Sequence, residues 1–194
     1  MMKPPQRAVL VLAAASLLTA CAGVIQPPEP KPDPQLAYVR EAFGRLTPGN
    51  WIAFSPVTPK AYVYIFADTT CPYSQALHTK VSEFNAKGIE VRYLARPSGE
   101  LKGRAWTLYQ NIWCSDNPKH ALDDAMKGKS IEAEKCTRED ILGLAEQQQL
   151  GDAVHVTATP TTFYQDGHWA QGVKRTEGLP ERAILGAQMV SNLR

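Results

Sequence analysis

The 194-residue chain lacks the features that mark several classes of protein. Its 21 Lys and Arg face 19 Asp and Glu without a basic run, which removes the electrostatic basis for nucleic-acid binding. Four cysteines are too few for a small disulfide scaffold, and no paired Cys/His spacing predicts zinc. No glycine-rich phosphate loop is visible. We therefore expect a folded domain that uses no metal, no cofactor and no nucleic-acid partner.

The longest apolar run, residues 8–18, is too short for a permanent membrane span, which takes about 17–25 apolar residues. Two basic residues precede it and Leu18-Thr19-Ala20-Cys21 follows, an order typical of a lipoprotein signal. We expect residues 1–20 to be a signal peptide and Cys21 to carry acyl chains, palmitate among them. The alternative is a soluble secreted protein. An Asp directly after the lipidated cysteine would favour retention at the inner membrane. Ala22 stands at this position instead, which favours the outer membrane and a periplasmic location.

Alternating prolines follow the proposed lipidation site, so residues 21–35 form an anchor and an extended tether. An ordered loop on the domain surface is the alternative for these prolines. Residues 36–50 then contain a short helix that ends near Pro48-Gly49. This helix either docks on its own domain, which we favour, or serves self-association. Its apolar stripe consists of Leu36, Val39, Phe43 and Leu46.

The first part of the domain predicts a strand, a helix and a second strand. Residues 61–67 form a mostly apolar run of β-forming residues, and residues 89–94 alternate in polarity. Between them a turn leads to Cys71, and Pro72 suits the first position of a helix. Apolar residues then recur at helical spacing until Gly88. The helical positions are Tyr73, Leu77, Val81 and Phe84.

The second part predicts helices, a hairpin and a closing helix. Residues 99–150 are helical in character, with breaks at Pro118 and near Gly128. Asp166-Gly167 is a strong hairpin signal between two short β-forming segments. Pro180 begins a final helix with apolar residues on one face. This order of elements predicts an α/β fold of the thioredoxin-like type with a helical insertion.

The cysteines divide into two kinds. Cys114 and Cys136 both lie in the helical insertion, and a bond between them would close a loop of about 23 residues. Cys71 would then be an unpaired thiol at the start of a helix. Unpaired backbone N–H groups at that position lower a thiol pKa and favour the thiolate, the nucleophilic form. The alternative for Cys71 is a buried, inert thiol.

Several segments of the chain together carry a family resemblance: 66–74 with Leu77-His78, 88–97, 112–114 with 125–130, and 157–161. On these segments, residues 51–190 resemble the bacterial periplasmic disulfide isomerases DsbC and DsbG of the thioredoxin superfamily. The resemblance implies a thioredoxin-like domain at 51–194, with its helical insertion at about 99–150. It also implies that Cys71 attacks substrate disulfides, that Cys114 and Cys136 form a structural disulfide, and that Pro160 is cis and faces Cys71. Substrate contacts would come from Thr159, Pro160, Pro72 and Tyr73.

Two departures from that family change the expected chemistry. Ser74 stands where the family has a second active-site cysteine, so the chain cannot form an internal active-site disulfide. Cys71 and Ser74 would form the catalytic pair, with the Ser74 hydroxyl donating a hydrogen bond to the Cys71 thiolate. Ser74 is either natural or a substitution introduced to trap a complex. Only about 25 residues stand in place of the family's dimerisation domain, which favours a tethered monomer.

We therefore expect an envelope-anchored thiol–disulfide interchange protein of isomerase character. Its partners would be disulfide-containing envelope proteins and a membrane thiol reductase. A non-catalytic lipoprotein that binds a Cys-containing client is the main alternative, and a redox relay, which Ser74 disfavours, is another. Asp68 either tunes the thiol or, as we favour, forms a turn or helix cap. Packing roles are expected for His78, Trp106, Trp113 and Trp169.

Overall fold

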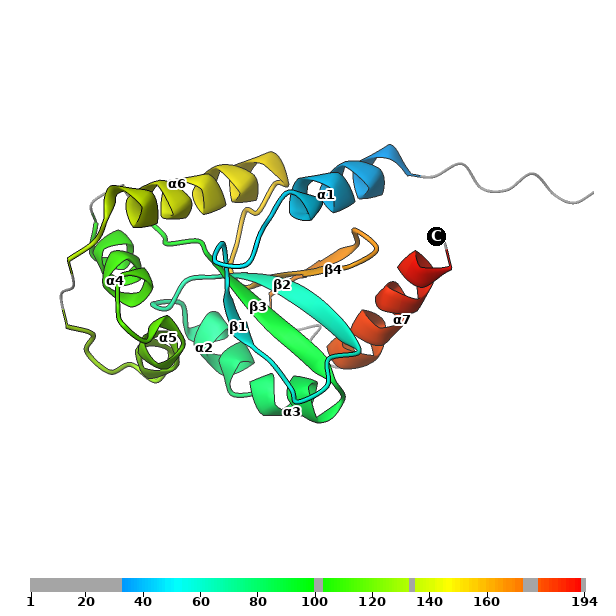
Figure 1. Ribbon diagram of the computed structural model, residues 1–194, viewed down its shortest axis with the longest axis horizontal. Coiled ribbons are helices and arrows are strands. Elements are labelled where there is room, and N and C mark those ends of the chain that lie inside the picture. Colours follow the sequence, from blue (N-terminus) through cyan, green and yellow to red (C-terminus); the bar gives the residue numbers. More distant parts are fainter. Residues whose placement is uncertain (1–32, 100–102, 133–134, 173–177, 193–194) are drawn as a thin grey trace, which may run out of the picture. The chain divides into compact units, whose positions relative to one another are not determined.

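The computed structural model describes residues 33–99, 103–132, 135–172 and 178–192 (Figure 1). The predicted signal peptide, Cys21 and most of the tether lie outside these residues and stay predictions. No helix within the described part is long and apolar enough to cross a membrane.

A five-stranded mixed sheet lies at the centre, with strand order β1-β3-β2-β4-β5. The central pair, β2 and β3, is parallel, and every other neighbouring pair is antiparallel. A parallel pair needs a crossover connection, which the helices after Cys71 supply. The predicted strand–helix–strand unit is therefore confirmed. The strands are β1 (Ile52–Phe54), β2 (Ala61–Ala67), β3 (Ile89–Ala95), β4 (Thr161–Tyr164) and β5 (Trp169–Gln171).

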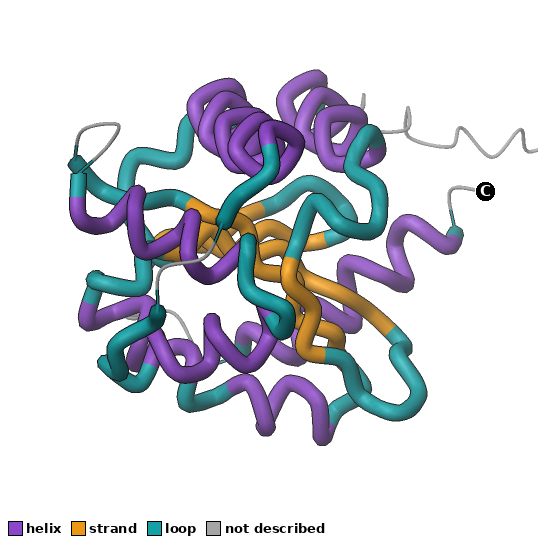
Figure 2. The backbone as a smooth tube through the Cα atoms, turned by 60° about the vertical axis from the view of Figure 1, so that its left-hand side comes forward, coloured by secondary structure: helices purple, strands orange, loops and turns teal. Residues whose placement is uncertain are grey.

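Helices cover both faces of this sheet (Figures 1 and 2). On one side lie α1 (Pro34–Gly44) and α6 (Arg138–Ala153), and on the other lie α2 (Pro72–His78), α3 (Val81–Ala86) and α7 (Leu179–Ser191). The insertion adds α4 (Arg104–Trp113) and α5 (Pro118–Met126) at one end. Together with the sheet order, this is the α/β architecture that the sequence predicts.

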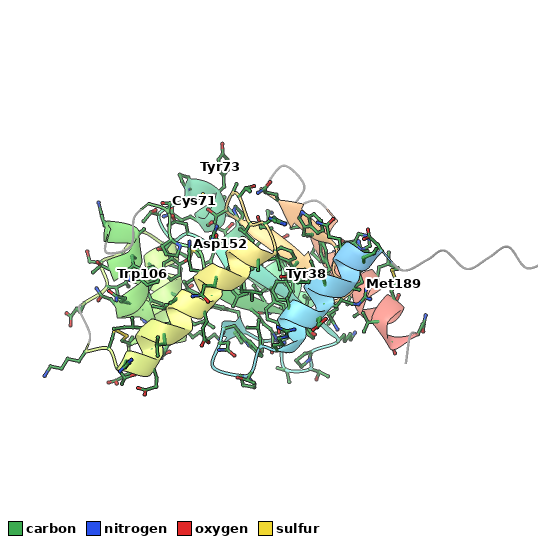
Figure 3. The ribbon with its side chains drawn as sticks, turned by 90° about the horizontal axis from the view of Figure 1, so that it is seen from above. Tyr38, Cys71, Tyr73, Trp106, Asp152 and Met189 are labelled. Atoms are coloured by element: carbon green, nitrogen blue, oxygen red, sulfur yellow. A yellow bond between two sulfur atoms is a disulfide. The ribbon has the colours of Figure 1, made fainter. Side chains whose placement is uncertain are left out.

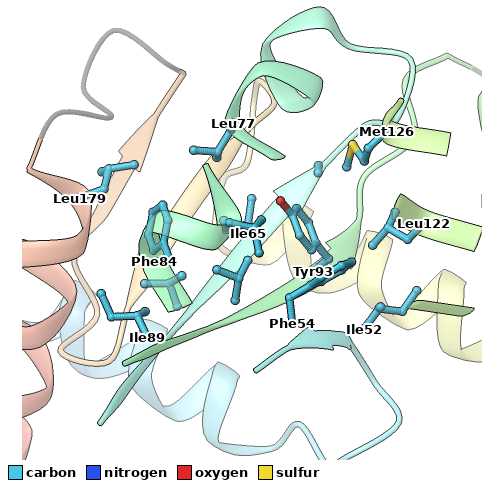
Figure 4. Close-up of a cluster of buried hydrophobic side chains, with 14 of the residues drawn as sticks. Ile52, Phe54, Ile65, Leu77, Phe84, Ile89, Tyr93, Leu122, Met126 and Leu179 are labelled. Atoms are coloured by element: carbon cyan, nitrogen blue, oxygen red, sulfur yellow. The ribbon is translucent and has the colours of Figure 1, made fainter. Parts of the chain in front are cut away.

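The hydrophobic core has a layer on each face of the sheet. Figure 4 shows the larger layer, where strand residues such as Ile65 and Tyr93 meet Leu77 and Phe84 from the helices. Burying a side chain of this size contributes about 1.5–3 kcal/mol relative to exposing it. These apolar contacts fix α2, and therefore the residues at its N-terminus, against the sheet.

The second layer of the core lies between α1 and the sheet. Val39 and Phe43 of α1 are buried against the sheet, and the Phe43 ring lies 4.8 Å from that of Tyr64, measured between centroids. Of the two alternatives for the helix predicted within 36–50, the structure shows docking on its own domain. Gly167 has φ +92°, and a Cβ there would lie 2.5 Å from the Leu36 carbonyl oxygen. Glycine is thus needed where the hairpin meets α1.

The insertion and the hairpin follow their predicted order. Pro118 begins α5, and β4 pairs with β5 around Asp166-Gly167. The structure contains the Cys114–Cys136 disulfide that the resemblance implied, with an S–S distance of 2.01 Å. Because the two cysteines are 22 residues apart, the crosslink contributes about 3 kcal/mol in the chain-entropy model. Of the tryptophans, Trp106 is buried, Trp113 is partly buried and Trp169 is exposed.

Two local features of the fold differ from the prediction. Strand β1 was not expected, because three residues are too few to show an alternation. The single helix expected from Pro72 to Gly88 is interrupted at Thr79 and Lys80, where the Lys80 backbone (φ −96°, ψ 2°) leaves the helical region. Tyr73 lies in α2 as expected, and 61% of its surface is exposed.

Candidate active site

Cys71 lies where the chain passes from β2 into α2. It occupies the N-cap position, with extended backbone angles (φ −82°, ψ 120°), and its N–H donates to the Asp68 carbonyl oxygen over 3.0 Å. Pro72 follows in the first helical position, where the missing N–H costs nothing. Cys71 is partly exposed and is the free cysteine of the described residues. Its sulfur is thus fixed in place yet accessible.

A second segment, directly before β4, meets this thiol. The Thr159–Pro160 peptide bond is cis, and the Cys71 thiol donates a hydrogen bond of 3.4 Å to the Thr159 carbonyl oxygen. Pro160 is buried, whereas Thr159 is partly exposed. The fold therefore brings together two segments that lie 88 residues apart. The resemblance implied this juxtaposition, and the structure contains it.

The surroundings of the sulfur favour its charged form. Partial burial raises the pKa of Cys71, but hydrogen bonds to the sulfur lower it by more. In order of size, these bonds involve the Ser74 N–H, the Thr159 side chain, the Tyr73 N–H and the Ser74 hydroxyl. The net result is a pKa below the ordinary value of a thiol. Since the thiolate is the nucleophile in disulfide exchange, this shift increases the reactive fraction near neutral pH.

Ser74 lies buried within the first turn of α2, with 1% of its surface exposed. Its hydroxyl oxygen accepts a hydrogen bond of 3.3 Å from the Asp68 N–H. That bond leaves the hydroxyl proton available to the Cys71 sulfur, in agreement with the lowered pKa. Ser74 can therefore stabilise the thiolate, but it offers no sulfur for an internal disulfide. The other two described cysteines are bonded to each other.

The exposed border of the site consists of Pro72 and Tyr73. Both are exposed, and Figure 3 shows the Tyr73 side chain projecting beside Cys71. An exposed aromatic ring next to a reactive sulfur offers apolar area to an incoming chain. Pro72, Tyr73, Cys71 and Thr159 thus form one surface, while Ser74 and Pro160 support it from beneath.

Asp68 makes a contact that sequence reasoning missed. Its carboxylate accepts hydrogen bonds from the Thr70 N–H and hydroxyl, at 2.8 and 2.7 Å, so the predicted turn is confirmed. It does not cap α2, whose N-cap is Cys71 without a side-chain cap bond. The other carboxylate oxygen accepts from the Ser98 N–H over 2.8 Å. Only the tertiary fold brings Ser98 to this position.

His78 lies at the far end of α2 and takes no part in the thiol site. Its Nδ1 lies 3.0 Å from the Tyr93 hydroxyl and its Nε2 lies 3.1 Å from an Asp123 carboxylate oxygen. Burial lowers the pKa of His78, although Asp123 acts in the opposite direction. The expected packing role agrees with this position, where His78 joins α2 to β3 and α5.

Comparison with known proteins decides the family. Residues 56–187 match the family model described as a thioredoxin-like domain. The chain belongs to the thioredoxin-like family. The fold expected from the sequence is thereby confirmed.

Curated relatives of this family member are thiol:disulfide interchange proteins named DsbC. The Salmonella typhimurium protein is 33% identical over 121 residues, which cover 62% of this chain and 49% of that protein. The Dickeya dadantii protein is 34% identical over 140 residues, or 72% and 56% of the two chains. The chain thus spans about half the length of the curated relatives it matches.

Solved structures show the same fold at lower identity. A disulfide interchange protein from Neisseria gonorrhoeae superimposes with a TM-score of 0.60 at 22% identity, covering 72% of this chain and 99% of that one. A linker-deletion mutant of Proteus mirabilis ScsC gives a TM-score of 0.61 at 16% identity, covering 81% and 85%. At these identities the likeness concerns the fold alone.

Proposed function

We propose that this protein is a thiol–disulfide interchange protein that rearranges disulfides in client proteins with Cys71 as its single nucleophile. The observation that carries the proposal is the partly exposed Cys71 thiol, with a lowered pKa, beside cis Pro160 and above a buried Ser74. The names of the curated relatives support interchange chemistry, and Ser74 favours isomerisation over net oxidation or reduction.

The first step is attack by the Cys71 thiolate on one sulfur of a client disulfide. The client S–S bond breaks, a mixed disulfide forms between Cys71 and that sulfur, and the other client sulfur leaves as a thiolate. A different client thiolate then attacks the client sulfur of the mixed disulfide. A new client disulfide forms and the Cys71 thiolate is released. The number of disulfides is the same before and after, so no oxidant or reductant is consumed.

Ser74 determines how the mixed disulfide is resolved. A cysteine at this position could attack Cys71 and expel the client in reduced form, whereas a hydroxyl cannot. The mixed disulfide therefore persists until a thiol of the client, or of a second protein such as a membrane reductase, resolves it. The longer lifetime gives the client time to present another of its own thiols, which favours isomerisation.

The client chain would be held by the surface around the sulfur. Since the Thr159 carbonyl oxygen lies 3.4 Å from Sγ, a client backbone joined to Cys71 runs alongside Thr159. Pro72 and Tyr73 follow Cys71 directly and are exposed, so the Tyr73 ring would contact apolar client side chains.

We further propose that the domain works on the periplasmic side of the bacterial envelope, anchored through Cys21. One experiment tests function and location together. The full chain is expressed in a Gram-negative bacterium, thiols are quenched with acid and alkylated, and captured adducts are identified by mass spectrometry. We expect reducible adducts through Cys71 in the outer-membrane fraction. They should disappear in the Cys71→Ala variant.

A matched control replaces residues 1–21 with the cleavable signal of a soluble periplasmic protein. The Cys71 adducts should then move to the soluble fraction with the same clients. Adducts that stay in the membrane fraction would contradict the anchor. A wild-type protein that holds its clients without any covalent adduct on Cys71, as the Cys71→Ala protein does, would contradict interchange and favour the binding lipoprotein.

A further inference from the structure

Two grooves flank the Cys71 site and share one wall. The first has a cavity volume of about 530 Å³ and lies on the side of Thr159, with Asp152 and His155 along its border. The second, of about 560 Å³, lies on the side of Thr69, Thr70 and Gln75. Ser98 and Gly99 line both grooves, so these two residues form the wall between them.

One carboxylate ties this shared wall to the turn that precedes Cys71. Asp68 is buried, with 1% of its surface exposed. One of its oxygens accepts from the Ser98 N–H, and the other accepts from the N–H and hydroxyl of Thr70. Hydrogen bonds to an ionised carboxylate are roughly twice as strong as neutral ones. The position of the wall relative to the sulfur therefore depends on Asp68.

We infer that Asp68 is a positioning residue for client binding: it holds the Ser98–Gly99 wall so that both grooves beside Cys71 stay open. The inference rests on the proposed function, because the grooves would receive the client segments on either side of the reacting disulfide. Without the bond from Ser98 to Asp68, the Ser98–Gly99 wall would be free to move into either groove. Client affinity would then fall while the sulfur itself remained reactive.

We call the hydrogen bonds from Thr70 and Ser98 to the Asp68 carboxylate the clamp. The reactivity of the Cys71 sulfur does not depend on these bonds. The hydrogen bonds that join Asp68 to Cys71 and Ser74 use main-chain atoms of Asp68, its carbonyl oxygen and its N–H. Substitution of the side chain leaves those two bonds in place. An asparagine has a single acceptor oxygen and serves either Thr70 or Ser98, not both. Asp68→Asn thus weakens the clamp and keeps the hydrogen bonds that stabilise the thiolate.

Asp166 provides a matched control. It is also a buried aspartate, 4% exposed, and it accepts from the His168 N–H two residues on and from Arg182. It lies in the β4–β5 turn, at the end of β4 away from Pro160. Asp166→Asn removes the same charge from a buried turn without touching either groove. It therefore separates a loss of general stability from a loss of client positioning.

The test measures reactivation of scrambled ribonuclease A by the wild-type, Asp68→Asn and Asp166→Asn proteins, alkylation of Cys71 by iodoacetamide, and hydrogen exchange at the Ser98 amide. For Asp68→Asn we expect KM to rise about five- to tenfold, with kcat and the alkylation rate within about twofold of wild type. The Ser98 amide should exchange faster. Asp166→Asn should leave KM unchanged.

Three results would overturn the inference: an unchanged KM in Asp68→Asn, an equal rise in Asp166→Asn, or a fall in alkylation that matches the fall in client turnover. A wild-type protein without isomerase activity would instead contradict the proposed function. In that case the dissociation constant for reduced ribonuclease A decides the role of Asp68. A constant that is equal in the wild-type and Asp68→Asn proteins would overturn it.

Discussion

Replacement of Cys71 by alanine is expected to reduce catalysed reactivation of scrambled ribonuclease A to the background rate, a loss on the order of 10³-fold or more. The reason is that every bond exchange in the proposed cycle passes through this sulfur. The described residues offer no substitute, because Cys114 and Cys136 are already bonded to each other. The measurement is the rate at which ribonuclease activity returns, with a trace of thiol present to start exchange.

The control for this loss is suppression of aggregation by the same two proteins. The Cys71 side chain is not part of the buried hydrophobic clusters, so Cys71→Ala should fold and bind unfolded client as the wild-type protein does. Isomerisation that survives in Cys71→Ala would show that the sulfur is not the nucleophile. Equal suppression of aggregation by both proteins, with no catalysed reactivation by either, would favour a binding function.

The second large effect is expected from Ser74→Cys. The Ser74 hydroxyl is among the groups that lower the pKa of Cys71, and position 74 lies in the first turn of α2, so we expect a thiol there to reach the Cys71 sulfur. We expect this variant to form an internal disulfide between positions 71 and 74 in a glutathione redox buffer. It should then oxidise reduced ribonuclease A, a reaction that we do not expect the wild-type protein to catalyse. Intact mass and thiol counting after alkylation measure the internal bond.

Ser74→Ala provides the matched comparison for Ser74→Cys. It removes the hydroxyl donor without adding a sulfur, so it should gain no oxidase activity, and the pKa of Cys71 should rise. Two free thiols at positions 71 and 74 of Ser74→Cys under oxidising conditions would contradict this account of the site. Oxidase activity in the wild-type protein would contradict the assignment of isomerisation to the single thiol.

Local signals in the sequence predicted the parts of the fold that neighbouring residues determine. Strands β2 and β3 stand out because they are continuous or alternating apolar runs, and the hairpin stands out through Asp166-Gly167. The short strand β1 and the break at Thr79 and Lys80 were missed, since the strand has only three residues and the break leaves the apolar spacing intact.

In the candidate site, too, local sequence predicts some features, whereas others depend on contacts between distant parts of the chain. The position of Cys71 between a strand and a helix could be predicted from residues 61–84 alone. Its contact with Thr159, 88 residues away, came only from the family resemblance. The bond from Ser98 to Asp68 could not be predicted at all, because nothing near either residue in the sequence indicates that the turn and the β3–α4 connection meet. Long-range polar contacts of this kind require the tertiary structure.

The pH dependence of Cys71 alkylation tests most directly whether this sulfur is a thiolate nucleophile. Only the thiolate reacts with iodoacetamide, so the rate rises as pH passes through the pKa, and subtraction of the rate for Cys71→Ala isolates this residue. The account predicts a midpoint below the value of about 8.5 for a free thiol. A midpoint at or above that value would contradict it.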